Sequence, residues 1–92
     1  MERITEKHLQ AQIDRLNKLT NSPMKPYETT GKKYVAQIGN YHLDGAYGGW
    51  ELMRMENEGG GVSSPLRTGH ISKKELYGRI SAFIAGIESR GL

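Results

Sequence analysis

The chain has 92 residues, which is enough for one small domain and too few for two cores. Hydrophobic residues make up 36% of the chain and charged residues 25%, which predicts a compact but thin core and allows a homodimer as further stabilisation. Cysteine is absent, which excludes disulfides, thiolate metal sites and cysteine nucleophiles, while the net charge of +3 permits nucleic acid or an acidic protein as a partner without requiring either.

The first predicted element is a helix that begins after Thr5, whose hydroxyl is a good acceptor for a free backbone N–H. Leu9, Ile13 and Leu16 then repeat at helical spacing and predict one apolar face. The sequence at residues 21–23 (Asn-Ser-Pro) ends the helix, and a loop with two prolines follows.

The next residues predict a β-hairpin. Residues 34–38 and 41–44 flank Gly39 and Asn40, a pair that fits a tight two-residue turn. This turn would place Ile38 opposite Tyr41, and directly opposed residues share a face of the sheet. The predicted apolar face then consists of Tyr34, Ala36, Ile38, Tyr41 and Leu43.

Residues 50–56 predict a third strand, reached through a glycine-rich connection at residues 45–49. Trp50 and Leu52 share one of its faces, whereas Met53 and Met55 share the other. A strand with one solvated face is not expected to be apolar on both sides. This pattern predicts either that another part of the protein covers the second face of the strand or that the face carries an exposed apolar patch. Residues 57–70 follow as a Gly- and Ser-rich loop, of a length that is usually functional or disordered.

The last element is a helix capped by Ser72, with Glu75 three residues later in a capping-box pattern. Its apolar stripe consists of Leu76, Ile80, Phe83, Ile84 and Ile87. Gly78 and Gly86 each weaken this helix by about 1 kcal/mol relative to alanine, and we expect them to allow a close approach to the sheet. The order α-β-β-β-α predicts an α+β fold for residues 1–92 as a single domain, with both helices on one face of a three-stranded antiparallel sheet.

Catalytic and cofactor motifs are not apparent in the sequence. The serines lack a nucleophile-elbow context, and the glycine clusters match neither phosphate-loop pattern. His42 and Asp44 alternate on one strand face, where they read as a solvated polar face or as two metal ligands. A third ligand would have to come from Glu51, Glu56 or His70, and no spacing favours one of them. We therefore predict a protein that is not an enzyme and has no cofactor or metal.

Aromatic and methionine side chains near the open face of the predicted sheet are typical of protein interfaces. A plain core is the competing interpretation of these side chains. The interface candidates, together with the polar pair on the second strand, are Tyr47, Trp50, Met53, Met55, His42 and Asp44.

A second interpretation is a nucleic-acid-binding domain that contacts phosphates through cations. Lys73 and Lys74 stand at the start of the last helix, where cations oppose the helix dipole and are better tolerated beside phosphates. The candidate cations are Lys32, Lys33, Arg67, Lys73 and Lys74. With this lysine pair, the element order resembles a double-stranded RNA-binding domain, which implies recognition of A-form shape. Tyr77 stands where that family has a third lysine.

The stretch from Ile38 to Glu88 resembles small uncharacterised proteins of bacteriophages and prophages. It reads IGNYHLDGAYGGWELMRMENEGGG and then SKKELYGRISAFIAGIE. The resemblance implies a phage accessory protein and supplies no active residues. Residues 1–18 are charged throughout and lack the apolar stretch of a signal peptide, which favours the cytoplasm of a bacterial host and no membrane partner. We expect a counter-defence inhibitor that occupies a host protein or sequesters a small nucleotide-like ligand.

Overall fold

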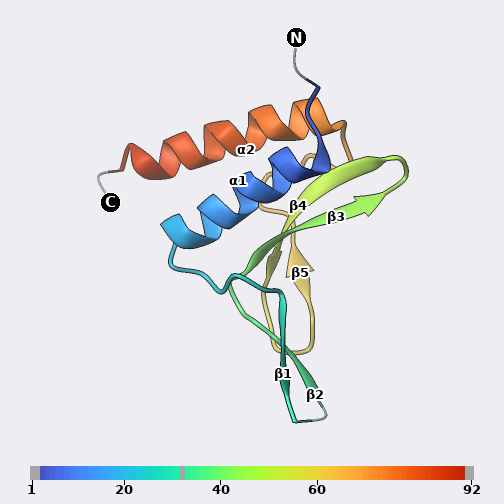
Figure 1. Ribbon diagram of the computed structural model, residues 1–92, viewed down its shortest axis with the longest axis vertical. Coiled ribbons are helices and arrows are strands. Elements are labelled where there is room, and N and C mark those ends of the chain that lie inside the picture. Colours follow the sequence, from blue (N-terminus) through green and yellow to red (C-terminus); the bar gives the residue numbers. More distant parts are fainter. Residues whose placement is uncertain (1–2, 32, 91–92) are drawn as a thin grey trace.

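The computed structural model describes residues 3–31 and 33–90, which form two helices above a three-stranded antiparallel sheet, with a separate two-stranded sheet beside them. Figure 1 shows the two helices lying together over β3 and β4, while β1 and β2 project from this body. The α+β class and the three-stranded antiparallel sheet are confirmed. The elements are α1 (Glu6–Leu19), β1 (Tyr27–Thr30), β2 (Lys33–Ala36), β3 (Tyr41–Ala46), β4 (Gly49–Met55), β5 (Val62–Ser63) and α2 (Lys73–Glu88).

Helix α1 begins where the sequence predicts. The Thr5 hydroxyl accepts a hydrogen bond from the His8 backbone N–H, and the His8 imidazole accepts one from the Thr5 N–H, so two free donors of the first turn are satisfied. The apolar stripe of Leu9, Ile13 and Leu16 is buried. The role of His8 was not predicted from the sequence, because the usual partner at this position is Glu or Gln.

Helix α2 is capped by the Ser72 side chain, which accepts from the Glu75 N–H, as predicted. Leu76, Ile80 and Ile84 form its buried stripe. The expected role of Gly78 and Gly86 is wrong, because a Cβ built at either position meets no atom within 4 Å. Neither glycine approaches the sheet closely.

The predicted hairpin over residues 34–44 is wrong. Strand β2 pairs with β1, in a register that runs from Tyr27 opposite Ala36 to Thr30 opposite Lys33. The two prolines that precede β1 predict a loop, but its sequence Tyr-Glu-Thr-Thr is rich in strand-forming residues and forms a strand. The turn between β1 and β2 includes Gly31, whose φ of +64° is the left-handed conformation that tight hairpin turns require.

Gly39 and Asn40 form a turn and a β-bulge instead of a hairpin. The Asn40 N–H donates to the Gln37 carbonyl at 3.2 Å, which closes the turn. The Gly39 N–H donates to the Met55 carbonyl, and the Met55 N–H donates to the Asn40 carbonyl, both at 2.8 Å. Gly39 and Asn40 on one strand therefore lie opposite the single residue Met55 on the other. Gly39 has a φ of +92°, as expected for the glycine of such a bulge. The chain thus bends out of the projecting β1–β2 hairpin and into β3.

The hairpin of the main sheet turns at Tyr47 and Gly48. Strand β3 pairs with β4 from Tyr41 opposite Arg54 to Ala46 opposite Gly49, and β5 extends the sheet on the other side of β4. Both turn residues have positive φ, 53° and 72°, which is the pattern of a type I′ turn. The glycine-rich connection expected at residues 45–49 is therefore mostly strand.

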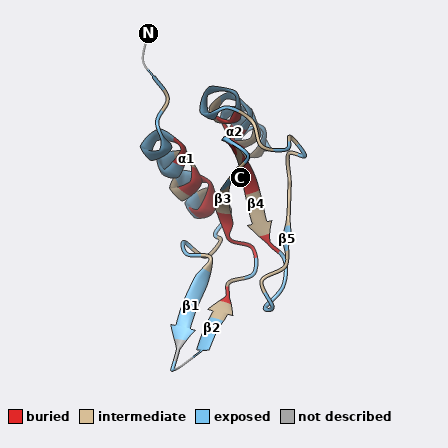
Figure 2. Ribbon diagram, turned by 90° about the vertical axis from the view of Figure 1, so that its right-hand side faces the viewer, coloured by how far each residue is buried: buried red, intermediate tan, exposed pale blue. Residues whose placement is uncertain are grey.

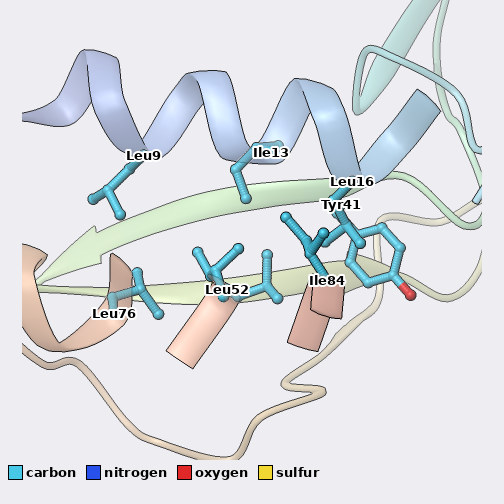
Figure 3. Packing of buried hydrophobic residues seen from close by; sticks show 8 residues of the cluster. Leu9, Ile13, Leu16, Tyr41, Leu52, Leu76 and Ile84 are labelled. Carbon is cyan, nitrogen blue, oxygen red and sulfur yellow. The ribbon is translucent and has the colours of Figure 1, made fainter. Parts of the chain in front are cut away.

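The hydrophobic core lies between the helices and one face of β3 and β4. Figure 2 shows the buried residues on the facing sides of these four elements, and Figure 3 shows the side chains from both helices meeting over the strands. Within the described residues, neither helix is long and apolar enough to cross a membrane. The buried cluster consists of Leu9, Ile13, Leu16, Tyr41, Leu52, Leu76, Ile80 and Ile84.

Asn17 joins α1 to the outer edge of β3. Its side-chain amide donates to the Tyr41 carbonyl at 3.0 Å, and its side-chain oxygen accepts from the Tyr41 N–H at 2.8 Å. Asn17 is completely buried. Because β3 is an edge strand, these backbone groups of Tyr41 have no strand to pair with, and the asparagine amide takes the place of a peptide group.

Replacement of Asn17 by alanine is expected to lower the free energy of unfolding by about 2–4 kcal/mol, because it leaves two buried backbone groups of Tyr41 without partners. Urea denaturation measures this loss. Lys18→Ala, at the exposed neighbouring position, is the matched control and should change stability by less than about 0.5 kcal/mol. Similar losses for both variants would contradict the role given to Asn17.

Candidate functional site

The face of the main sheet that points away from the helices carries the polar residues predicted to share a strand face. His42 lies opposite Met53, and Asp44 lies opposite Glu51. Successive side chains of a strand point to opposite faces of the sheet. These four side chains therefore share one face, and Leu43 and Leu52, between them in the sequence, point to the core. We describe this as the second face of the sheet.

The chain itself covers the second face near the β3–β4 turn, and Met55, on the same face at the other end of β4, is also buried. Trp50 and Ile71 exchange two backbone hydrogen bonds of 2.8 and 3.0 Å, which holds residues 64–71 beside β4. A Cβ on Gly49 would lie 2.8 Å from the His70 carbonyl carbon, so only glycine fits at this crossing. Much of the loop expected over residues 57–70 is thus fixed by β5 and by this bridge.

Glu51 anchors this covering segment to the sheet. The Ser64 hydroxyl and the Gly69 N–H both donate to its Oε2 atom, the latter at 3.1 Å. The Glu51 side chain is almost completely buried. A buried carboxylate needs such donors, and they explain how an acidic residue is tolerated at this position.

His70 lies between the two carboxylates of the second face. Its Nε2 atom is 2.7 Å from Asp44 Oδ2, and its Nδ1 atom is 4.0 Å from Glu51 Oε1. Asp44 remains 48% exposed, whereas the His70 side chain is 17% exposed. The edge of the imidazole also contacts the Tyr47 ring, with 5.6 Å between the ring centroids. Asp44, His70 and Tyr47 therefore form one connected group at the end of the hairpin.

The chemistry available to this group is limited. Both nitrogens of His70 face carboxylates, and the Ser64 hydroxyl donates to Glu51. A serine nucleophile would need the imidazole as its acceptor. In residues 3–31 and 33–90, no three His, Cys, Asp or Glu side chains are placed to hold a metal ion.

Tyr47 is the most exposed large hydrophobic residue that the structure describes, at 96%. Its φ of +53° is uncommon for any residue other than glycine, asparagine or aspartate, and it costs about 1–2 kcal/mol. The side chain buries almost nothing in return. Backbone strain without burial indicates a role outside the chain's own stability.

The structure brings together four of the six predicted interface residues and separates two. Trp50 lies on the core face, with its ring against Gly45, where an added Cβ would be 3.0 Å from the ring. Met55 is 1% exposed and cannot meet a partner in this fold. The remaining residues, with His70 added, form what we define as the Tyr47 surface: Tyr47, Asp44, His70, His42 and Met53.

Sequence reasoning considered His70 only as a third metal ligand. It lies 26 positions from Asp44 along the chain, and no local pattern links them. The positive φ of Tyr47 was not predicted either, because a longer connection was expected over residues 45–49 in place of a two-residue turn. The neighbouring Gly48 is the one local signal that could have indicated a two-residue turn here.

Partial burial lowers the pKa of the His42 imidazole below its usual 6.5, against the opposing effects of a hydrogen bond with Asn40 and the charge of Asp44. The His42 Nδ1 atom lies 3.2 Å from the Asn40 side-chain oxygen. Asn40 is itself completely buried and donates to the Pro23 carbonyl at 2.7 Å. His42 thus connects the Tyr47 surface to the bend that leads into β3.

The candidate phosphate contacts do not form one surface. Lys33 lies in the projecting hairpin, whereas Lys73 and Lys74 begin α2 at the opposite end of the molecule, as Figures 1 and 2 both show. Arg67 lies in the covering segment, with a φ of +51°. Lys32 lies outside the described residues. A continuous phosphate track would require these cations to be neighbours.

Comparison with known proteins gives no family: no family model, no curated protein and no solved structure matches this chain. The functional argument therefore rests on the geometry of the Tyr47 surface and on its chemistry.

The stability of the fold is expected to depend on His42 protonation. Its folded pKa is below the unfolded value of 6.5, so the unfolded chain binds more protons in this range and the free energy of unfolding falls as the pH falls through 6.5. Urea denaturation between about pH 5 and pH 7.5 measures the slope. In the His42→Gln variant, which keeps the other two histidines, the free energy of unfolding should depend less steeply on pH. Equal slopes in both proteins would refute the expectation.

Replacement of Tyr47 by asparagine is expected to leave the free energy of unfolding unchanged or to raise it by up to about 1 kcal/mol, because Asn-Gly is the preferred type I′ sequence. Tyr47→Val is the matched control and should destabilise the fold, since β-branched residues rarely adopt positive φ. Thermal and urea denaturation compare the variants. A clear loss of stability in the asparagine variant would show that the tyrosine serves the fold.

Proposed function

We propose that this chain is a non-enzymatic binding protein that docks a protein partner on the Tyr47 surface. The observation that carries the proposal is the tyrosine at the hairpin turn, 96% exposed and in a left-handed backbone conformation. The edge of the His70 imidazole contacts this ring, and Asp44 holds the imidazole. Tyrosine is enriched among interface anchors, and its rigid ring has few torsion angles to lose on binding.

The charges of this surface favour a protein over a nucleic acid. Asp44 is half exposed beside the His70–Tyr47 contact, where it would repel phosphates. Lys73 and Lys74 begin α2 at this end of the molecule, but Lys33 lies far from them in the projecting hairpin, so these three lysines form no continuous phosphate track. A suitable partner presents an apolar pocket for the phenol ring and a hydrogen-bond donor or cation for the Asp44 carboxylate.

The non-enzymatic part of the proposal is supported by the same geometry. Among the described residues, the nitrogens of the His70 imidazole lie nearest to carboxylates, and neither is hydrogen-bonded to a serine or threonine hydroxyl that could serve as a nucleophile. In this arrangement, His70 ties the covering segment to Asp44 and contacts the Tyr47 ring.

The biological setting is also proposed: a phage or prophage accessory protein that acts in the cytoplasm of a bacterial host, where it occupies a host factor as a counter-defence inhibitor. Its basis is the sequence pattern of residues 38–88, from which the resemblance to small phage proteins was inferred. The size of the chain also fits a protein that acts by covering a site on a larger partner.

Photo-crosslinking tests the docking surface. With benzoylphenylalanine in place of Tyr47, irradiation in bacterial cytosol is expected to yield one discrete protein adduct, because the side chain would lie in the partner's pocket. The matched control carries the same group in place of Tyr34, which is also highly exposed but lies in the projecting hairpin. Adducts are separated by mass and treated with nuclease.

The proposal requires an adduct that is specific to position 47 and resistant to nuclease. Identical adducts from both positions, or no adduct at all, would contradict docking at this surface. An adduct lost on nuclease treatment, with retention on duplex RNA that falls steeply with salt, would favour the nucleic-acid interpretation instead.

A further inference from the structure

A groove of about 710 Å³ lies at the end of the molecule where both helices finish. The side-chain hydrogen bonds between the helices join Gln12 to Ser81 and Arg15 to Glu88, so the helices run in the same direction and their C-terminal ends lie together, as Figure 1 shows. The β3–β4 turn, with Tyr47, is at the other end of these helices. The groove is therefore separate from the Tyr47 surface.

The groove is mostly apolar. Phe83 and Tyr41 meet edge to face in its wall, with 6.0 Å between the ring centroids. Leu19 from the end of α1 and Ile87 from α2 extend the apolar lining, and both are only partly buried by the core. The volume is within the range of sites for small molecules, which are typically about 300–1,000 Å³ and apolar with a few polar groups.

Gly86 keeps the groove open. It lies in the last turn of α2, which ends at Glu88, and a Cβ at this position would meet no atom within 4 Å. No packing contact within the chain therefore requires a glycine here, and a larger side chain would extend into the groove. Gly78, in the same helix, is equally open but does not line the groove, and nothing in the structure explains it.

Arg90 supplies the charge at the rim of the groove. Among the described residues, no carboxylate lies within 4.0 Å of its guanidinium, whereas Arg15 and Arg54 are both paired with glutamates. Both helices end here, and helix C-termini carry partial negative charge that repels anions. An anionic group in this groove would therefore depend on Arg90.

We propose that this groove binds a small aromatic molecule with one anionic group. The aromatic part lies against Phe83, Tyr41 and Ile87, and the anion pairs with Arg90. This inference is independent of the proposed protein partner, because the two sites share no residue.

Fluorescence titration with 8-anilinonaphthalene-1-sulfonate tests the site, because this probe has an aromatic body and one sulfonate. We expect saturable binding of one probe per chain. Gly86→Leu should weaken it by at least about tenfold by filling the groove, whereas Gly78→Leu, the matched control, should bind as the wild type does. Both substitutions favour the helix, so thermal midpoints at or above that of the wild type show that the fold is intact.

Arg90→Gln gives the second test and should weaken probe binding by about tenfold while removing most of its salt dependence. Several outcomes would overturn the proposal: no saturable binding, equal affinity in Gly86→Leu and the wild type, or equal losses in both glycine variants. Sedimentation that depends on concentration and is abolished by Gly86→Leu would also overturn it, since a second copy of the chain would then occupy the groove.

Discussion

The architecture depends on how the outer edge of β3 is satisfied. This strand enters the sheet directly after the Gly39–Asn40 bulge, and no other strand of residues 3–31 and 33–90 lies beyond it. The buried Asn17 amide pairs with both backbone groups of Tyr41 and so fixes α1 across the edge. Because α1 also carries three of the buried core residues, the same contact determines where the core lies and where α2 can pack.

The two candidate sites lie at opposite ends of the layer formed by the helices. At the turn end, Glu51, His70 and Asp44 form a polar group beside the exposed Tyr47 ring. At the other end, the helices finish over Tyr41 and Phe83, with the groove between them. Tyr41 takes part in the Asn17 contact and also lines the groove, so the element that stabilises the edge of the sheet also shapes this pocket.

The candidate site was only partly predictable. The two-residue period of a strand placed His42 and Asp44 on one face, because this alternation is a property of the backbone. The covering segment was not predictable, since its attachment depends on a backbone bridge between Trp50 and Ile71 and on the close crossing at Gly49. The burial of Met55 likewise follows from tertiary packing, because Met53 and Met55 have the same local pattern and different exposure.

The sequence by itself determined both helices. Their caps at Thr5 and Ser72 and their apolar stripes are short-range features, satisfied within a few residues. Only the tertiary structure decided the strand pairing. The composition of Gly39–Asn40 fits a tight turn. The predicted hairpin of residues 34–38 with 41–44 and the observed pairing are both compatible with the alternation of side chains along the strands. Strand β2 pairs with its neighbour in the chain, β1, and Met55, which is distant in sequence, bonds to the backbone of Gly39 and Asn40 and so directs the chain into β3.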